Sequence, residues 1–328
     1  MAITVKDLSN MTGYSTSTVS RVLSGRGYVD THTRAIIEQA VRDSGYLYHP
    51  SPTRRNSIDM VMLILSRVDN ETYAQESAGI SSVFDSKNIM YVGAYSEQFN
   101  TEKMEAYMAR AIKNRFKGMI LFSPVETPAF QKIMRHCSIP CVALNRPLDT
   151  VDADTVCMDN KAAGKLATEH LIAKGHRRIV HLSLSDISSG SYRTKGYLEA
   201  MTDAGLEPAV LPVEDTYDAG VAAGLRIAAE MPEMTAIYAV NEIVSRGAME
   251  GLLRCGKQVP EDISIISTDN TLISIISQPH LTTVCCDTRQ MGIEAANLFL
   301  ERCQNPTGAK QHRFLPPILL ERDSVAVL

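Results

Sequence analysis

The chain lacks the sequence features of membrane proteins, secreted proteins and metalloproteins. Its first residues, MAITVKDLSN, contain no basic start followed by an apolar run, and no segment approaches the roughly eighteen apolar residues of a membrane span. The seven cysteines are odd in number and form no pair of CxxC motifs, which argues against a disulfide framework and a zinc site. We expect a soluble, cytoplasmic protein with reduced, mostly buried thiols, no metal, no cofactor and no membrane partner.

Catalytic motifs are missing as well. The sequence has no GxSxG elbow, no HExxH and no Walker A loop, and GRGYVD lacks the third glycine of GxGxxG and follows no strand. The eight histidines show no metal-ligand spacing. We therefore expect a protein that is not an enzyme.

Charge is distributed unevenly along the chain. With 328 residues, of which 45% are hydrophobic, the chain is long enough for two or three domains. Residues 1–55 carry seven Lys/Arg and four Asp/Glu, so the net charge of −4 divides into +3 on this segment and −7 on the remainder. A polyanion such as DNA would be attracted to the N-terminal segment alone.

Residues 3–46 read as three short helices. Thr4, Ser15 and Asp30 are suitable N-caps, and Gly13 and Gly45 are suitable ends for the first and third helices. Two short helices joined by a glycine-containing turn, with a third beside them, predict a helix-turn-helix.

In a helix-turn-helix, the start of the second helix meets base edges in the major groove. Thr16 and Ser17 occupy that position, and Arg21, one turn later, is able to make a bidentate contact with guanine. Ser15, Thr18 and Ser20 have the hydroxyl groups expected of phosphate contacts, and Thr4 and Tyr28 complete the contact set that we predict for this domain. The alternative is a small helical protein-interaction domain with ordinary caps.

The rest of the chain alternates strand-like and helix-like segments. The predicted strands cover residues 58–66, 90–96, 118–123, 141–145, 178–184, 209–213, 236–241 and 263–269. The helices between them lie near residues 74–87, 101–115, 161–174, 191–205, 219–229 and 243–255. This alternation predicts the α/β class, with parallel sheets in two similar lobes and a ligand cleft beyond the carboxyl ends of the strands.

Polar and aromatic side chains follow several of these strands. They are Asp69, Asn70, Tyr73, Ser123, Asn145, Asn241 and Asp269. Carboxylate and amide groups form several hydrogen bonds at once, as sugar hydroxyls require. For Asp69, Asn70 and Asn145, an ordinary role at the start of a loop is an equally good interpretation.

The N-terminal run VKDLSNMTGYSTSTVSRVLSGRGYVDTHTRAIIEQAVRDSGY resembles the headpiece of the LacI/GalR family of transcriptional regulators, and TVSRVLSG is its most diagnostic part. Further segments occur in the family's order, namely AGISSVF, GHRRI, YRTKGYLEAM, VPEDISIISTDN and PHLTTV. The resemblance therefore covers essentially the whole chain. It implies a repressor that binds double-stranded operator DNA as a homodimer and is controlled allosterically by a small effector, such as a sugar.

The resemblance also implies a domain plan and a pocket. The plan is a helix-turn-helix domain (1–46), a linker (47–57) and a periplasmic-binding-protein-like body (58–328). The N-lobe would comprise about 58–157 and 287–314, and the C-lobe about 158–286 and 315–328. The family's effector-binding Arg and Asp fall on Arg193 and Asp269, with Asn241 nearby.

Two departures from the family pattern concern the pocket and the linker. The chain has no Trp for an aromatic platform under a sugar ring, so Tyr217 is the nearest candidate and Phe122 a weaker one. The linker has two prolines at alternate positions, which disfavours the family's hinge helix. We predict an extended linker in which Arg54 and Arg55 contact phosphates or the minor groove.

Alternative functions remain open for a two-lobed α/β body. The chain would then be a ligand-binding protein or a carbohydrate-acting enzyme whose N-terminal helices bind another protein. A transporter's solute-binding protein would need a secretion signal. The ending LLERDSVAVL looks like a strand without heptads, so a tetramer built by a C-terminal coiled coil is not expected.

Overall fold

The computed structural model describes residues 3–24, 28–44, 46, 58–68, 70–97, 100–184 and 188–328. The chain separates into two compact units, Met1–Asn56 and Ser57–Leu328. The predicted extended linker, with Arg54 and Arg55, lies outside the described residues.

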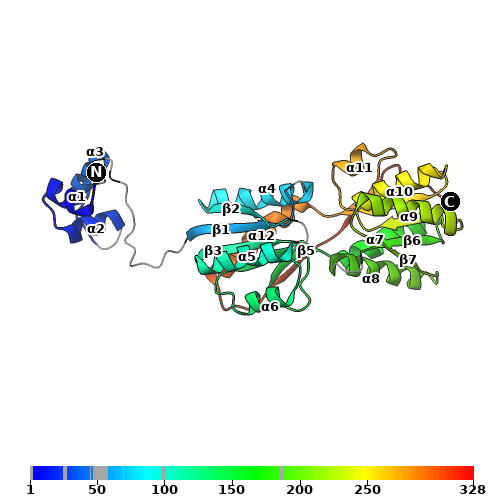
Figure 1. Ribbon diagram of the computed structural model, residues 1–328, viewed down its shortest axis with the longest axis horizontal. Coiled ribbons are helices and arrows are strands. Elements are labelled where there is room, and N and C mark those ends of the chain that lie inside the picture. The colour runs from blue at the N-terminus through cyan, green and yellow to red at the C-terminus, as the bar shows by residue number, and fades with distance from the viewer. Residues whose placement is uncertain are drawn as a thin grey trace. The chain divides into compact units, whose positions relative to one another are not determined.

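The first unit contains three helices (Figure 1), which are α1 (Val5–Thr12), α2 (Thr16–Ser24) and α3 (Thr31–Ser44). The predicted caps are present. The Thr4 side chain accepts a hydrogen bond from the Asp7 N–H and closes a capping box, Ser15 accepts from the Thr18 N–H, and Asp30 accepts from the Thr33 N–H. Leu8, Val19, Val22 and Ile37 are buried together and hold the helices around one small core.

The second unit contains two six-stranded sheets with helices on their faces (Figure 1). The first sheet has the order β11-β5-β4-β3-β1-β2. Its strands are β1 (Ile58–Leu65), β2 (Met90–Tyr95), β3 (Phe116–Phe122), β4 (Cys141–Leu144), β5 (Asp154–Met158) and β11 (His312–Leu315), and its helices are α4 (Glu71–Ser86), α5 (Thr101–Lys113), α6 (Pro128–Arg135) and α12 (Thr288–Gln304).

The second sheet has the order β12-β10-β9-β8-β6-β7. Its strands are β6 (Ile179–Ser183), β7 (Ala209–Pro212), β8 (Ala236–Ala239), β9 (Ser264–Thr268), β10 (Thr282–Cys285) and β12 (Ile318–Leu320), and its helices are α7 (Asn160–Ala173), α8 (Ser188–Asp203), α9 (Tyr217–Glu230), α10 (Glu242–Arg254) and α11 (Leu272–Ile276). Both sheets are parallel except where β10 pairs with β12. The predicted α/β architecture is confirmed.

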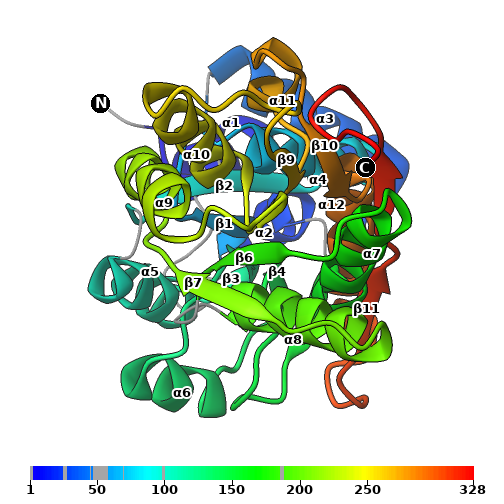
Figure 2. The same cartoon turned by 90° about the vertical axis from the view of Figure 1, so that its right-hand side faces the viewer.

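Helix pairs cover the faces of the sheets, as α9 and α10 show by running side by side in both views (Figure 2). The pair α7 and α8 packs closely at Gly164, where an added methyl group would collide with the backbone carbonyl of Arg193. Only glycine permits this approach. The contact fixes the backbone of Arg193, which enters the site described below.

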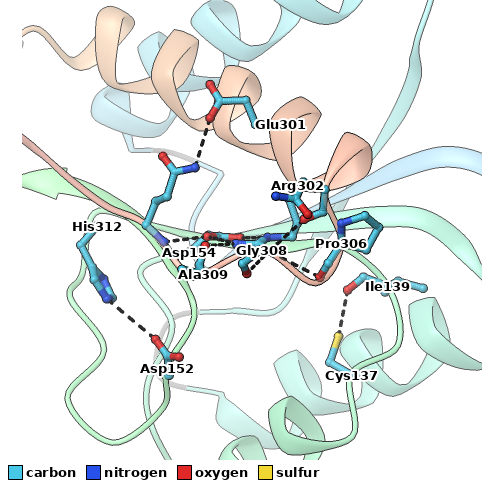
Figure 3. Close-up of polar contacts among 12 residues, drawn as sticks. Cys137, Ile139, Asp152, Asp154, Glu301, Arg302, Pro306, Gly308, Ala309 and His312 are labelled. Carbon is cyan, nitrogen blue, oxygen red and sulfur yellow. Dashed lines mark hydrogen bonds and ion pairs between the residues drawn. The ribbon is translucent and has the colours of Figure 1, made fainter.

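A buried ion pair fastens the edge of the first sheet (Figure 3). Arg302 on α12 donates to both carboxylate oxygens of Asp154 on β5, with Nε–Oδ2 at 2.6 Å and Nη2–Oδ1 at 2.9 Å. The same guanidinium donates to the carbonyls of Gly308 at 2.6 Å and Ala309 at 2.7 Å. Because both charges have several partners, the loop that leads into β11 is held in place.

Two expectations need correction. The seven cysteines are all unpaired thiols, but only Cys141, Cys157 and Cys285 are buried, and Cys255 is exposed because it follows the end of α10 at the surface. The strand-like ending is limited to β12, since residues 321–328 form no strand. Among the described residues, no helix has both the length and the apolar character that a membrane span needs.

Candidate functional site

The exposed face of α2 is made of short polar side chains and one arginine. Thr16, Ser17, Ser20 and Arg21 are exposed, whereas Val19 faces the core. This arrangement gives the predicted base-reading residues access to a partner on one side of the helix.

The other predicted contact residues of the first unit have different surroundings. The Ser15 hydroxyl is 2.8 Å from the Ser17 hydroxyl and 2.9 Å from the Thr18 hydroxyl, and Thr4 is hydrogen-bonded to Asp7. Tyr28 is 91% exposed. A tyrosine so exposed contributes little to the core and is available for contact with another molecule.

The second unit contains a cavity of about 190 Å³ that is lined from both sheets. Seven of the predicted pocket residues line it: Asn70, Tyr73, Ser123, Asn145, Arg193, Asn241 and Asp269. We call the part formed by residues after β1, β3 and β4 the first-sheet wall, and the part formed by residues after β7, β8 and β9 the second-sheet wall. The carboxyl ends of the strands thus bring together side chains that are far apart in sequence.

Three of these residues have unusual backbone conformations. Ser123, Asn145 and Asp269 have φ values of 48°, 72° and 80°, and each directly follows the last residue of a strand. Residues other than glycine rarely adopt this left-handed backbone conformation, and such backbone strain is concentrated at functional sites.

Arg193 is the best-anchored side chain of the pocket. Its Nε donates to Asn160 Oδ1 at 2.9 Å and its Nη1 donates to the Val240 carbonyl at 2.5 Å. Its Nη2 lies 3.5 Å from Asp269 Oδ1, which is longer than a strong charge-assisted hydrogen bond. Asp269 therefore keeps hydrogen-bonding capacity for a ligand.

The carboxyl groups around the pocket are partly desolvated. Asp269 retains 37% exposure of its side chain but lies deep in the cleft, and desolvation raises its pKa. Burial also raises the pKa of Glu242 to about 7 and that of Glu76 well above its usual value. Glu76 Oε2 accepts from Asn145 Nδ2 at 2.8 Å, and within the described parts of the chain its Oε1 has no partner.

The predicted aromatic candidates do not line the cavity. Phe122 is 1% exposed and packs against Tyr73 with ring centroids 5.4 Å apart, and Tyr217, the first residue of α9, is 39% exposed outside the pocket lining. Tyr73 is the aromatic residue of the lining, and its hydroxyl is 3.0 Å from Ser66 Oγ. Asp69 lies outside the described residues.

The sequence prediction missed many polar residues of the lining, and three of them are notable for their charge or hydrogen bonds. They are Arg146, Asn160 and Asp215. Asp215 Oδ1 accepts from Asn241 Nδ2 at 2.6 Å, and Arg146 Nη1 donates to the Pro124 carbonyl at 3.2 Å. Arg146 and Asp215 follow the predicted strands β4 and β7 by two and three positions, so the strand-end rule could have identified them, whereas Asn160 follows β5, which was not predicted.

The pocket has the character of a site for a small polar molecule. In the part of the chain that the structure describes, no three His, Cys, Asp or Glu side chains are placed to hold a metal ion. Most of the lining residues carry hydroxyl, amide, guanidinium or carboxylate groups, and the others are apolar.

Comparison with known proteins gives matches in both units. Residues 4–51 match the family of bacterial regulatory proteins of the lacI type, and residues 168–325 match the periplasmic binding protein-like domain. The chain is 28% identical to the HTH-type transcriptional regulator CelR of Thermobifida fusca over 98% of both chains. It is 27% identical to the HTH-type transcriptional repressor PurR of Vibrio atlanticus over 99% of both.

Solved structures of transcriptional regulators also match nearly the whole chain. The CelR–cellobiose complex is 27% identical, covers 98% of this chain and 99% of its own, and superimposes with a TM-score of 0.74. The lac repressor dimer bound to operator and an anti-inducer has a TM-score of 0.83 over 99% of this chain and 100% of its own, and at 23% identity it supports the fold alone.

The fold and site define a protein with a helix-turn-helix unit and a periplasmic-binding-protein-like unit that carries a polar ligand pocket. The chain belongs to the LacI/GalR family of DNA-binding transcriptional regulators. It is accordingly not an enzyme.

Proposed function

We propose that this regulator is a cytoplasmic repressor that binds operator DNA as a homodimer and responds to a carbohydrate effector. The observation that carries the proposal is the polar pocket at the carboxyl ends of both sheets, where Arg193, Asn241 and Asp269 meet. Such groups suit sugar hydroxyls because each forms two or more hydrogen bonds. The cellobiose complex of the related CelR supports a carbohydrate.

Control of DNA binding would follow from the way the pocket is built. Because its two walls come from different sheets, a ligand that contacts both walls favours one arrangement of the lobes. We propose that the chain follows the predicted domain plan, in which the headpiece is residues 1–46, the linker is 47–57 and the body is 58–328. The chain would cross between the two lobes of the body near residues 157, 286 and 315. A shift of one lobe would change the spacing of two headpieces on a two-fold symmetric operator.

For DNA recognition, we propose that Arg21 reads a guanine and that Thr16 and Ser17 contact base edges. The hydroxyls of Ser15, Thr18 and Ser20, together with Thr4 and Tyr28, would contact the DNA backbone. Arg54 and Arg55 of the linker would contact phosphates or the minor groove. One headpiece with about three base-reading side chains discriminates weakly, since a good contact contributes about 1–3 kcal/mol. Two headpieces on one operator would give the required specificity.

The test is to select binding sites for the full-length protein from a random DNA library. We expect a two-fold symmetric site. Arg21→Ala should lower affinity for it by about 1–3 kcal/mol and relax one base preference in each half-site. Arg42→Ala is the matched control, because Arg42 is an exposed arginine on α3. An unchanged base preference in Arg21→Ala would remove Arg21 from the reading face, and the absence of any selected sequence would contradict the proposed function.

A further inference from the structure

The two walls of the pocket differ in charge. Asp215 and Asp269 lie on the second-sheet wall, and Arg193 on α8 faces Asp269 at 3.5 Å. The first-sheet wall carries Arg146, which follows β4, and also Arg67, which follows β1 and has an interaction partner of its own. The pocket is therefore more basic on one side than on the other.

Acidic groups beside the first-sheet wall do not offset this charge. Glu97 lines the cavity but forms an ion pair with Lys103. Glu76 lies behind Asn145, and its raised pKa favours the neutral acid. Neither of these two carboxyl groups is paired with Arg146.

Arg146 stands out among the arginines of the pocket. Its Nη1 donates to a neutral carbonyl, that of Pro124, and among the described residues no carboxylate forms an ion pair with its guanidinium. Asp215, on the opposite wall, is the acid whose charge acts on it from a greater distance. Desolvation lowers the pKa of Arg146, which shows that its charge is held at a cost.

The surroundings of Arg146 are suited to an oxyanion. The hydroxyls of Ser66, Tyr73 and Ser123 line the same wall. Those of Ser66 and Tyr73 lie 3.0 Å apart, so one of their two protons joins the pair and the other is available to a ligand. The sixteen-residue helix α4 begins beside them, with Thr72 and Tyr73 of its first turn in the lining, and the N-terminus of a helix favours negative charge. A guanidinium with several hydroxyl donors forms a fork for phosphate or carboxylate oxygens.

We propose that the effector carries an oxyanion group, as in a phosphorylated or carboxylated sugar, and that this group binds Arg146. The sugar hydroxyls would then face Asp215, Asn241 and Asp269 on the second-sheet wall. The inference rests on the proposed function, since it specifies the effector of the same pocket. In this proposal, Arg146 is the residue that makes the pocket bind anionic sugars more tightly than neutral ones.

The experiment measures the melting temperature of the full-length protein with three groups of compounds at matched ionic strength. These are neutral hexoses and pentoses, the corresponding sugar phosphates, and the corresponding sugar acids; inorganic phosphate is included as the bare oxyanion. Each is tested on wild type, Arg146→Gln, Arg146→Lys and the control Arg135→Gln, whose arginine is exposed on α6. The phosphate and acid groups distinguish the two sources of the oxyanion.

We expect at least one anionic sugar to raise the melting temperature of wild type and to bind at least tenfold more tightly than its neutral counterpart. Arg146→Gln should lose this preference, Arg146→Lys should recover part of it, and Arg135→Gln should behave as wild type. Without ligand, Arg146→Gln should melt no lower than wild type, because it removes a charge that the protein leaves poorly compensated.

Three results would overturn the inference. They are stabilisation by neutral sugars alone, the absence of stabilisation by every anionic compound, and an anionic preference that survives in Arg146→Gln. The first of these leaves the proposed function intact, since a neutral sugar that also changes operator binding would still be an effector. The proposed function is contradicted by a different result, namely that the wild-type protein binds no operator DNA.

Discussion

Two arginine–aspartate pairs in the body, Arg302–Asp154 and Arg193–Asp269, differ in how completely the protein satisfies them. In the first pair the side chains are 5% and 0% exposed and two short hydrogen bonds join them. In the second pair the side chains are 11% and 37% exposed and the shortest separation is 3.5 Å. The first pair joins α12 to β5, next to the edge strand β11, and the second lies in the pocket.

The difference shows how structural and ligand-binding charges can be distinguished. Arg302 and Asp154 use their hydrogen-bonding capacity on each other and on neighbouring backbone groups, so they have little left for a ligand (Figure 3). Asp269 is held in a strained backbone conformation and has only a long contact with its arginine. A charged side chain whose hydrogen-bonding capacity the fold leaves partly unused is therefore a candidate for binding a ligand.

The largest expected effect comes from breaking the satisfied pair. Arg302→Met would leave Asp154 buried without its cation and should lower the free energy of unfolding by about 3–5 kcal/mol. Urea unfolding followed by circular dichroism measures this loss. The control is Arg313→Met, which removes the more exposed ion pairs with Glu294 and Glu301 and should cost less than about 1 kcal/mol. Equal losses in the two variants would contradict the comparison.

The pH dependence of stability tests the desolvated carboxyls near the pocket. Burial raises the pKa of Glu242 from 4.5 to about 7, so the unfolded chain releases this proton more readily than the folded protein. Stability should therefore fall as pH rises from about 4.5 to 7, by up to about 3 kcal/mol from this group. Unfolding of Glu242→Gln across this range should show a smaller decrease. An identical pH profile in wild type and variant would contradict the assignment.

A smaller effect is expected from a hydrogen bond that joins the two sides of the cleft. Tyr192 on α8 donates to Asp149 Oδ1, in the loop after β4, at 3.0 Å. Tyr192→Phe should lower the free energy of unfolding by at most about 1 kcal/mol, because the bond is largely exposed. Effector affinity should change more clearly, by about twofold to tenfold, if the bond helps to hold the walls together. Titration calorimetry measures the effector affinity. An unaltered affinity in Tyr192→Phe would show that this hydrogen bond does not contribute to effector binding.

Much of this architecture could be predicted from sequence, because its signals are local. Cap residues such as Thr4 and Asp30 identify helix starts, and eight apolar segments identify strands. The strands β5, β10 and β11 were not predicted, and β12 was predicted only as part of the longer strand-like ending LLERDSVAVL. Their places in the sheets depend on pairing with distant strands.

The pocket was predicted less completely. Arg193 and Asp269 were identified through the family resemblance, and the strand-end rule added residues such as Asn145. The rule did not anticipate that Phe122 would pack behind Tyr73, because the burial of a ring depends on tertiary contacts. Nor could the sequence show that Arg302 has several partners and Arg146 few, since the surroundings of a guanidinium are known only from the fold.

The central claim, that this pocket controls DNA binding, is tested most directly by comparing wild type and Asp269→Ala on the selected operator. Fluorescence anisotropy would give operator affinity with and without the sugar that most raises the melting temperature. The account predicts equal operator affinity of the two proteins without sugar, a change of about fivefold to a hundredfold in wild type with sugar, and no change in Asp269→Ala. A full response of Asp269→Ala to the sugar would contradict it.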